Sequence, residues 1–235
     1  MPVYQGRQLN VNDSRESVVP VFQESMTLIH EGKTEEGFAG FAKLPEWFKD
    51  IQFVGGVGFI APGKTTETTL FVEHGTYTLE CYVKSPEGIF HSAMGMTAGL
   101  VVTNEASSET PPEPTMELNI SSNGIEAPSE LKPGKHIIAI NFKDQKAHEH
   151  FGGHDVHLVK LDENTNLDSL ALWVNWVEVQ GLRTPAPAKF LGGSQEMPAG
   201  NTAYFNIELE AGRYAWISEV PNPAEKNMLK VFSIQ

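Results

Sequence analysis

The chain contains an internal repeat, which limits it to folds that a unit of about half its length can form. Residues 53–81 align without a gap to residues 190–218, and eight of the 29 positions are identical. The identities include the Phe-x-Gly-Gly start and the Gly-x-Tyr near the end of each segment. We therefore predict two homologous domains, 1–103 and 116–235, joined by the linker 104–115.

The linker and the start of the first copy depart from the repeat. Residues 104–115 read NEASSETPPEPT, a composition that buries little apolar surface and favours an extended connection. Nothing before Gln8 matches the opening of the second copy, residues 116–134. The first copy is therefore shorter at its start than the second.

Within each copy the pattern is mostly that of β-strands. Apolar side chains alternate with others over 77–83 and again over 214–218, the period expected of a strand with one buried face. Segments 135–142 and 203–209 read as further strands, and one helix per copy is expected near 35–48 and 167–178. Short strands with frequent turns predict an all-β fold of two Greek-key β-sandwich domains in tandem.

Composition excludes several classes of function. The 235 residues carry a net charge of −13, which argues against binding to nucleic acid or to anionic membranes. No apolar run approaches the roughly 18 residues of a membrane span, and one cysteine allows no internal disulfide. The first 17 residues lack the apolar core of a secretory signal, as in a cytoplasmic protein or a mature form.

One hairpin combines three side chains that suit copper. Cys81 ends the alternating strand, His91 follows ten residues later, and Met96 lies in a Gly-Met turn before the next strand. Thiolate, imidazole and thioether form the ligand set of a blue-copper site, which a strand, a loop and a returning strand can assemble.

This C-x9-H-x4-M pattern, with the Gly-x-Tyr-x-x-x-Cys before it, resembles the ligand loop of the cupredoxins, the plastocyanin and azurin family. Residues 154–162, HDVHLVKLD, resemble the family's upstream histidine strand. The resemblance implies an eight-stranded Greek-key sandwich for each copy. It also implies one copper ion on Cys81 and His91, with Met96 as a weak axial ligand.

The first copy lacks the second histidine that such a site uses. The alignment places Gln23, or Glu24 after a shift of one residue, where the second copy has His154. We expect this segment to be a strand, on which His30 would lie roughly 20 Å too far along to replace it. Gln23 is therefore the predicted fourth ligand, with Glu24 as the alternative.

The second copy shows the opposite departure, because Ser218 replaces the cysteine and its loop contains no histidine. It keeps His154 and a methionine, Met228, but a type 1 site cannot form there. This degenerate copy is expected to act as a scaffold, an interaction module or a surface for homo-oligomers.

A histidine-rich segment offers a different metal site. Its imidazoles could hold copper or zinc, although on a strand His154 and His157 would point to opposite faces. A solvated loop is the simpler interpretation, and a single His-x-His pair argues against a trinuclear oxidase. The histidines concerned are His148, His150, His154 and His157.

These observations lead to one functional hypothesis and two alternatives. The hypothesis is a copper-binding protein, not an enzyme, that transfers electrons to a partner protein or handles copper. By family resemblance it would be periplasmic or secreted. The alternatives are a structural or partner-binding protein whose sites have decayed, and a small mononuclear copper enzyme.

Overall fold

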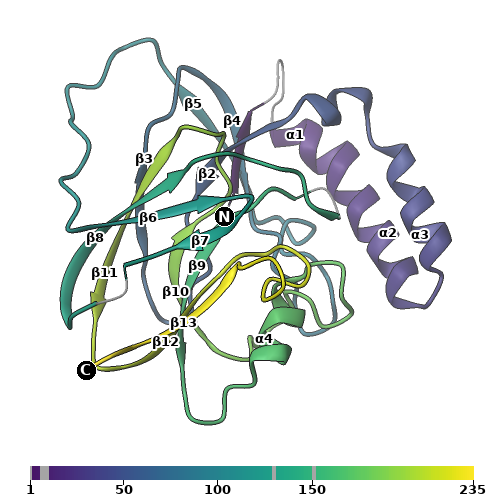
Figure 1. The fold of residues 1–235 in the computed structure, drawn as a ribbon. Helices are drawn as coiled ribbons and strands as arrows, with labels where there is room; N and C mark the ends of the chain where they lie inside the picture. Colours follow the sequence, from purple (N-terminus) through teal and green to yellow (C-terminus); the bar gives the residue numbers. More distant parts are fainter. Residues whose placement is uncertain (1, 6–10, 129–130, 150–151) are drawn as a thin grey trace.

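Strands of the second half supply most of a two-layer β-sandwich (Figure 1). The structure, a computed structural model, describes residues 2–5, 11–128, 131–149 and 152–235. One sheet has the order β10-β9-β12-β13, and the facing sheet has the order β3-β11-β8-β6-β7. The second-half strands are β6 (Met116–Ser121), β7 (Gly124–Glu126), β8 (Gly134–Phe142), β9 (Val156–Leu161), β10 (Lys189–Ser194), β11 (Thr202–Leu209), β12 (Gly212–Ile217) and β13 (Leu229–Ile234).

The main hydrophobic core lies between these two sheets. Alternate residues of β12, Tyr214 and Trp216, point into it and meet Ile138 and Ile140 of β8. The intervening residues of β12 face the opposite side, where helix α4 (Leu167–Val174) covers them. Both faces of this sheet are therefore covered, which explains why β9 is buried almost throughout.

The first half repeats one of these sheets. Its strands β1 (Pro2–Gln5), β2 (Gln52–Gly56), β4 (Gly75–Glu80) and β5 (Thr97–Val102) have the order β2-β1-β4-β5. This order matches β10-β9-β12-β13, strand for strand. The fifth strand, β3 (Glu67–Leu70), leaves this sheet and pairs with β11. Among residues 2–5 and 11–102, none forms a counterpart of β6, β7 and β8.

The two halves meet at residues that the sequence alignment equates. Val57 bridges to Ser194, and Thr68 pairs with Phe205. In both pairs the partners are 137 positions apart, which is the offset between the aligned segments 53–81 and 190–218. The backbone bonds at the first joint are reciprocal: Gly58 N donates to the Gly193 oxygen at 3.1 Å, and Gln195 N donates to the Gly56 oxygen at 3.0 Å. Equivalent residues facing each other are the mark of a twofold arrangement, so the halves pack like the two subunits of a symmetric dimer.

Helices replace the missing strands at the start of the chain. Residues 11–50 form α1 (Val11–Asp13), the π-helix η1 (Ser14–Val18), α2 (Val19–His30), α3 (Thr34–Gly40) and the short 3-10 turns Phe41–Lys43 and Glu46–Asp50. Figure 1 shows α2 and α3 as a hairpin at one side of the β-structure. The helices approach closely because α3 presents Gly37, where a Cβ would lie only 2.5 Å from the Ile29 side chain.

Most of the predicted elements are present. The all-β sandwich class is confirmed, as are the strands expected over 135–142, 203–209 and 214–218. The strand expected over 77–83 is present in its first part only, because β4 ends at Glu80. Helices occur within both segments where one was expected. The linker 104–115 contains neither helix nor strand, whereas the domain bounds on either side of it stay a prediction.

One local prediction is wrong. The segment containing Gln23 and His30 was expected to be a strand, but it is the helix α2. The expectation came from the alignment with the second copy, which fails here because residues 11–50 belong to no repeated strand. Apolar residues at Val19, Phe22 and Met26 follow the helical spacing of three and four.

The joint between the halves can be tested at Gly58. A Cβ at this position would lie 2.6 Å from the Gly193 nitrogen and 2.7 Å from the Gly192 carbonyl carbon, so Gly58→Ala must separate the two strands. We expect a loss of about 2 kcal/mol or more in the free energy of unfolding, measured by urea denaturation. The control is Gly152→Ala, whose Cβ would meet nothing within 4 Å. Equal stability of the two variants would contradict this account of the joint.

Candidate metal centre and a buried acid–histidine cluster

The predicted ligand hairpin is held together by backbone hydrogen bonds. Cys81 follows β4 directly, and its nitrogen donates to the Met96 oxygen at 3.0 Å. Ser92 N donates back to the Cys81 oxygen at 2.8 Å, and Met96 N donates to the His91 oxygen at 2.9 Å. These bonds fix the three predicted ligand positions relative to one another.

The hairpin brings the thiol and the imidazole together. Cys81 Sγ lies 3.5 Å from His91 Nδ1. Metal bonds of about 2.3 Å to sulfur and 2.0 Å to nitrogen, at a tetrahedral angle, separate these two atoms by about 3.5 Å. The pair therefore fits a shared metal ion. A copper ion bound there would supply one-electron redox chemistry.

Burial affects the chemistry of the thiol. It raises the pKa of Cys81, because the surrounding protein disfavours the thiolate more than the neutral thiol. The thiol therefore keeps its proton in the free protein. A metal that takes up the sulfur must displace that proton, so affinity is expected to rise with pH.

The other predicted ligands, Met96, Gln23 and Glu24, are exposed or bound to other protein groups. Met96 is half exposed, with 48% of its surface open to solvent, at the outer end of the hairpin. Gln23 faces the ligand loop from α2, but its amide oxygen accepts a hydrogen bond from Phe90 N at 2.9 Å. Glu24, the alternative, forms an ion pair with Lys43 at 2.8 Å. Both side chains on α2 therefore bind protein groups.

His30 does not join this site either. It lies seven residues beyond Gln23, a rise of about 10 Å along a helix and not the 20 Å of a strand. Burial lowers the pKa of His30, and the nearby cations of Lys84 and Arg183 lower it further. The His30 ring is therefore neutral at pH 7, and the charged groups near it are Lys84 and Arg183.

The histidine-rich segment forms one close pair. His148 Nε2 lies 3.4 Å from His154 Nδ1, and His154 Nε2 lies 2.9 Å from the Asp144 backbone oxygen. His150 lies outside the described residues. His157 points elsewhere, as the strand geometry predicted for it relative to His154.

The equivalent of the cysteine in the second half is part of a different structure. Ser218 Oγ donates to Asp155 Oδ1 at 2.8 Å and accepts from Asp155 N at 3.1 Å. The residue beside Ser218 is thus Asp155, not His154. This polar pair continues into a buried cluster that the sequence reasoning did not identify.

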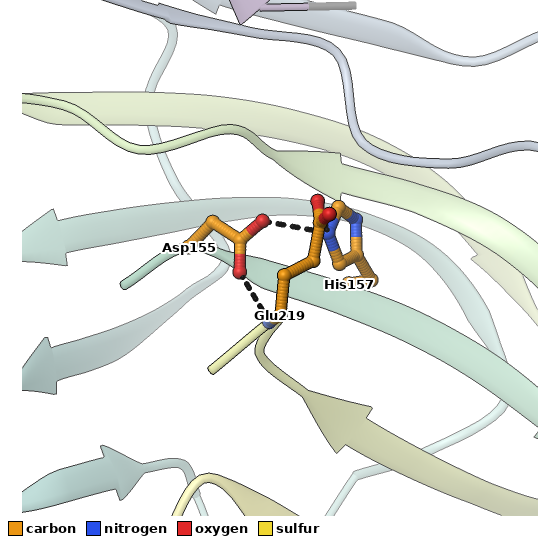
Figure 2. A group of neighbouring side chains, drawn as sticks. All are labelled: Asp155, His157 and Glu219. Atoms are coloured by element: carbon orange, nitrogen blue, oxygen red, sulfur yellow. Dashed lines mark hydrogen bonds and ion pairs between the residues drawn. The ribbon is translucent and has the colours of Figure 1, made fainter. Parts of the chain in front are cut away.

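Figure 2 shows this cluster, which consists of Asp155, His157 and Glu219. His157 Nε2 lies 2.8 Å from Asp155 Oδ2 and 2.9 Å from Glu219 Oε1. Asp155 also accepts from the Glu219 nitrogen at 2.8 Å. Tyr82, from the first half, donates its hydroxyl to Glu219.

The backbone on the far side of the ring determines the protonation of His157. Phe59 N donates to His157 Nδ1 at 3.1 Å, and the two rings stack with centroids 4.4 Å apart. Burial opposes an imidazolium, whereas the attraction of Asp155 and Glu219 favours one and acts to raise the pKa of His157. The hydrogen bond outweighs this attraction, because a second ring proton would point at the Phe59 N–H. The ring therefore carries its proton on Nε2.

The proton on His157 Nε2 disfavours metal binding at that atom. The three side chains are close enough to share an ion, but a metal at Nε2 would need a lone pair there. That would require an imidazolate or the loss of the Phe59 hydrogen bond. The cluster is therefore better suited to holding protons than to holding a metal.

The two carboxyl groups are in opposite states. Although burial disfavours its charge, the attraction of the His157 Nε2–H, together with hydrogen bonds from His157 and Glu219, lowers the pKa of Asp155 to about 2. Burial and the charge of Asp155 raise the pKa of Glu219 to about 8. At neutral pH the cluster thus contains one carboxylate and one carboxylic acid.

The sequence contained a weak indication of this cluster. Glu219 is the equivalent of Tyr82 in the repeat, and the two contact each other across the local twofold arrangement. An alignment can equate these residues but cannot show that they touch.

Comparisons with known proteins found only distant structural likenesses. No family model matches the chain, and no curated protein matches it. The similar solved structures include two auracyanins. One is dithionite-reduced auracyanin from the photosynthetic bacterium Roseiflexus castenholzii, with 11% identity, a TM-score of 0.35, and coverage of 51% of this chain and 94% of that chain. The other is auracyanin B, with 10% identity, a TM-score of 0.35, and coverage of 54% and 93%.

Among the described residues, no helix has the length and apolar character needed to cross a membrane.

The protonation of Glu219 can be tested through stability. The pKa of Glu219 is raised in the folded state. The stabilisation of the fold by protonated Glu219 is therefore complete below the unfolded-state pKa near 4.5 and is lost as the pH rises through about 8. Glu219→Gln removes this dependence. As the pH rises from 5 to 8, we expect the free energy of unfolding of the variant to increase by about 3 kcal/mol relative to that of the unaltered protein, as measured by urea denaturation.

The matched control is Glu208→Gln, an exposed position on β11. The change in the free energy of unfolding that this control substitution causes should be the same at pH 5 and at pH 8. A Glu219→Gln effect that does not vary with pH would show that Glu219 is ionised throughout.

Proposed function

We propose that this protein binds one copper ion in its first half, through Cys81 and His91 with Met96 as a third, weaker ligand. The observation that carries the proposal is the 3.5 Å approach of Cys81 Sγ to His91 Nδ1. Sulfur and imidazole nitrogen are the ligands that copper prefers. Gln23 serves this site by holding the ligand loop through Phe90.

The bound copper would act in electron transfer or in copper handling. The rigid hairpin supports electron transfer, because ligands that do not move keep the cost of a change in oxidation state low. The half-exposed Met96 places the site near the surface, within reach of a partner protein. A periplasmic or secreted location is part of this proposal.

Removing the thiol tests the site. We expect one equivalent of Cu(II) to produce a visible thiolate-to-copper absorption band on the unaltered protein. Cys81→Ser should lose this band, with a fall in copper affinity on the order of 100-fold or more. Circular dichroism of the copper-free variant checks that it is folded. Unchanged affinity in Cys81→Ser would refute the assignment.

Two methionines of the same loop provide a matched pair. Met96→Leu should shift the absorption band and the reduction potential while copper still binds. Met94→Leu, at a position 63% exposed, should leave both unchanged. Equal spectra for the two variants would exclude Met96 from the site.

A further inference from the structure

A pocket of about 510 Å³ lies where the α2–α3 hairpin meets the second half of the chain. One side is aromatic: the Phe22 ring packs against Phe41, Phe48 and Trp176 with centroids 5.0, 5.6 and 5.7 Å away. The other side reaches the buried cluster at Asp155 and Glu219. A volume of this order accommodates a small organic molecule.

The charged groups around the pocket are mostly acidic. Its lining contains one ammonium group, Lys49, and five carboxyl groups: Glu80, Glu149, Asp155, Glu196 and Glu219. An anionic ligand would therefore be repelled.

Glu196 stands out among these groups. It accepts a hydrogen bond from Gly153 N at 2.7 Å. Among the described residues, no Lys, Arg or His comes within ion-pair distance of it. A carboxylate in this position lacks the cation that normally compensates for burial.

We propose that this pocket binds an organic ammonium ion with an aromatic body. The ammonium group lies at Glu196 and Glu219, and the body lies against Phe22, Phe90 and Trp176. Aromatic faces attract a cation as well as an apolar group, so both parts of the ligand are accommodated. A metal ion is a poorer fit, because His157 carries its proton on Nε2, the atom that faces the carboxyl groups.

Protons are displaced when such a ligand binds. Burial raises the pKa of Glu196 to about 7, and burial together with Asp155 raises that of Glu219 to about 8. A cation beside them favours their ionised forms and lowers both pKa values. Binding at pH 7 therefore releases protons, and affinity increases from pH 6 to pH 8.

Three related probes test the charge requirement on the copper-free protein. They share an indole ring: tryptamine is a cation, 3-indolepropionamide is neutral, and 3-indolepropionate is an anion. Isothermal titration at pH 7 should show tryptamine binding at least tenfold more tightly than the other two. Its heat should vary with the ionisation enthalpy of the buffer, which measures the protons released. No tryptamine binding, or equal binding of the three probes, would overturn the proposal.

Two variants locate the ammonium group. Glu196→Gln and Glu219→Gln should each weaken tryptamine binding on the order of tenfold. Glu208→Gln is the control and should leave tryptamine affinity unchanged, because Glu208 is exposed on β11 and lies outside the pocket lining. Circular dichroism checks the fold of each variant, and Glu196→Gln suffices if Glu219→Gln does not fold. Unchanged affinity in Glu196→Gln would refute the assignment.

Discussion

The structure depends on backbone pairing between equivalent residues of the two halves. Val57 meets Ser194 and Thr68 meets Phe205, so the chain joins itself as two subunits of a symmetric dimer would. The joint requires glycine, since Gly58 and Gly193 bring two backbones into contact without side chains between them. Strand β3 then extends the sheet that covers the main core, although it belongs to the first half.

This joint also brings groups of the first half to the buried cluster and its pocket. Phe59, next to the joint, supplies the N–H that determines which nitrogen of His157 carries the proton. Tyr82 supplies a hydroxyl to Glu219 from the first half. Neither half alone would position these groups. The Cys81–His91 pair differs, because one hairpin supplies both side chains. The two candidate sites therefore require different amounts of the fold to be in place.

The truncation of the first copy explains the helices. The second copy covers one face of its sheet with β6, β7 and β8, whereas the first half has helices over residues 11–50. These helices form one wall of the pocket, where Phe22 packs against Trp176 of the second half. The part of the chain that departs from the repeat is thus the part that makes the pocket possible.

The sequence by itself determined the all-β class, the main strands and the approach of Cys81 to His91. All of these follow from local patterns: alternation of side chains, turn residues, and ligands separated by one short loop. Tertiary structure decided what local patterns cannot specify. Gln23 lies on helix α2, in a segment that has no counterpart among the strands of the second half. Its amide oxygen accepts a hydrogen bond from the backbone of the ligand loop at Phe90. The cluster of Asp155, His157 and Glu219 arises because two segments that are 62 residues apart come together beside Phe59 and Tyr82 of the other half. Both carboxyl groups are buried, and the interactions of Asp155 with His157 and the Glu219 backbone then decide that Glu219 holds the proton.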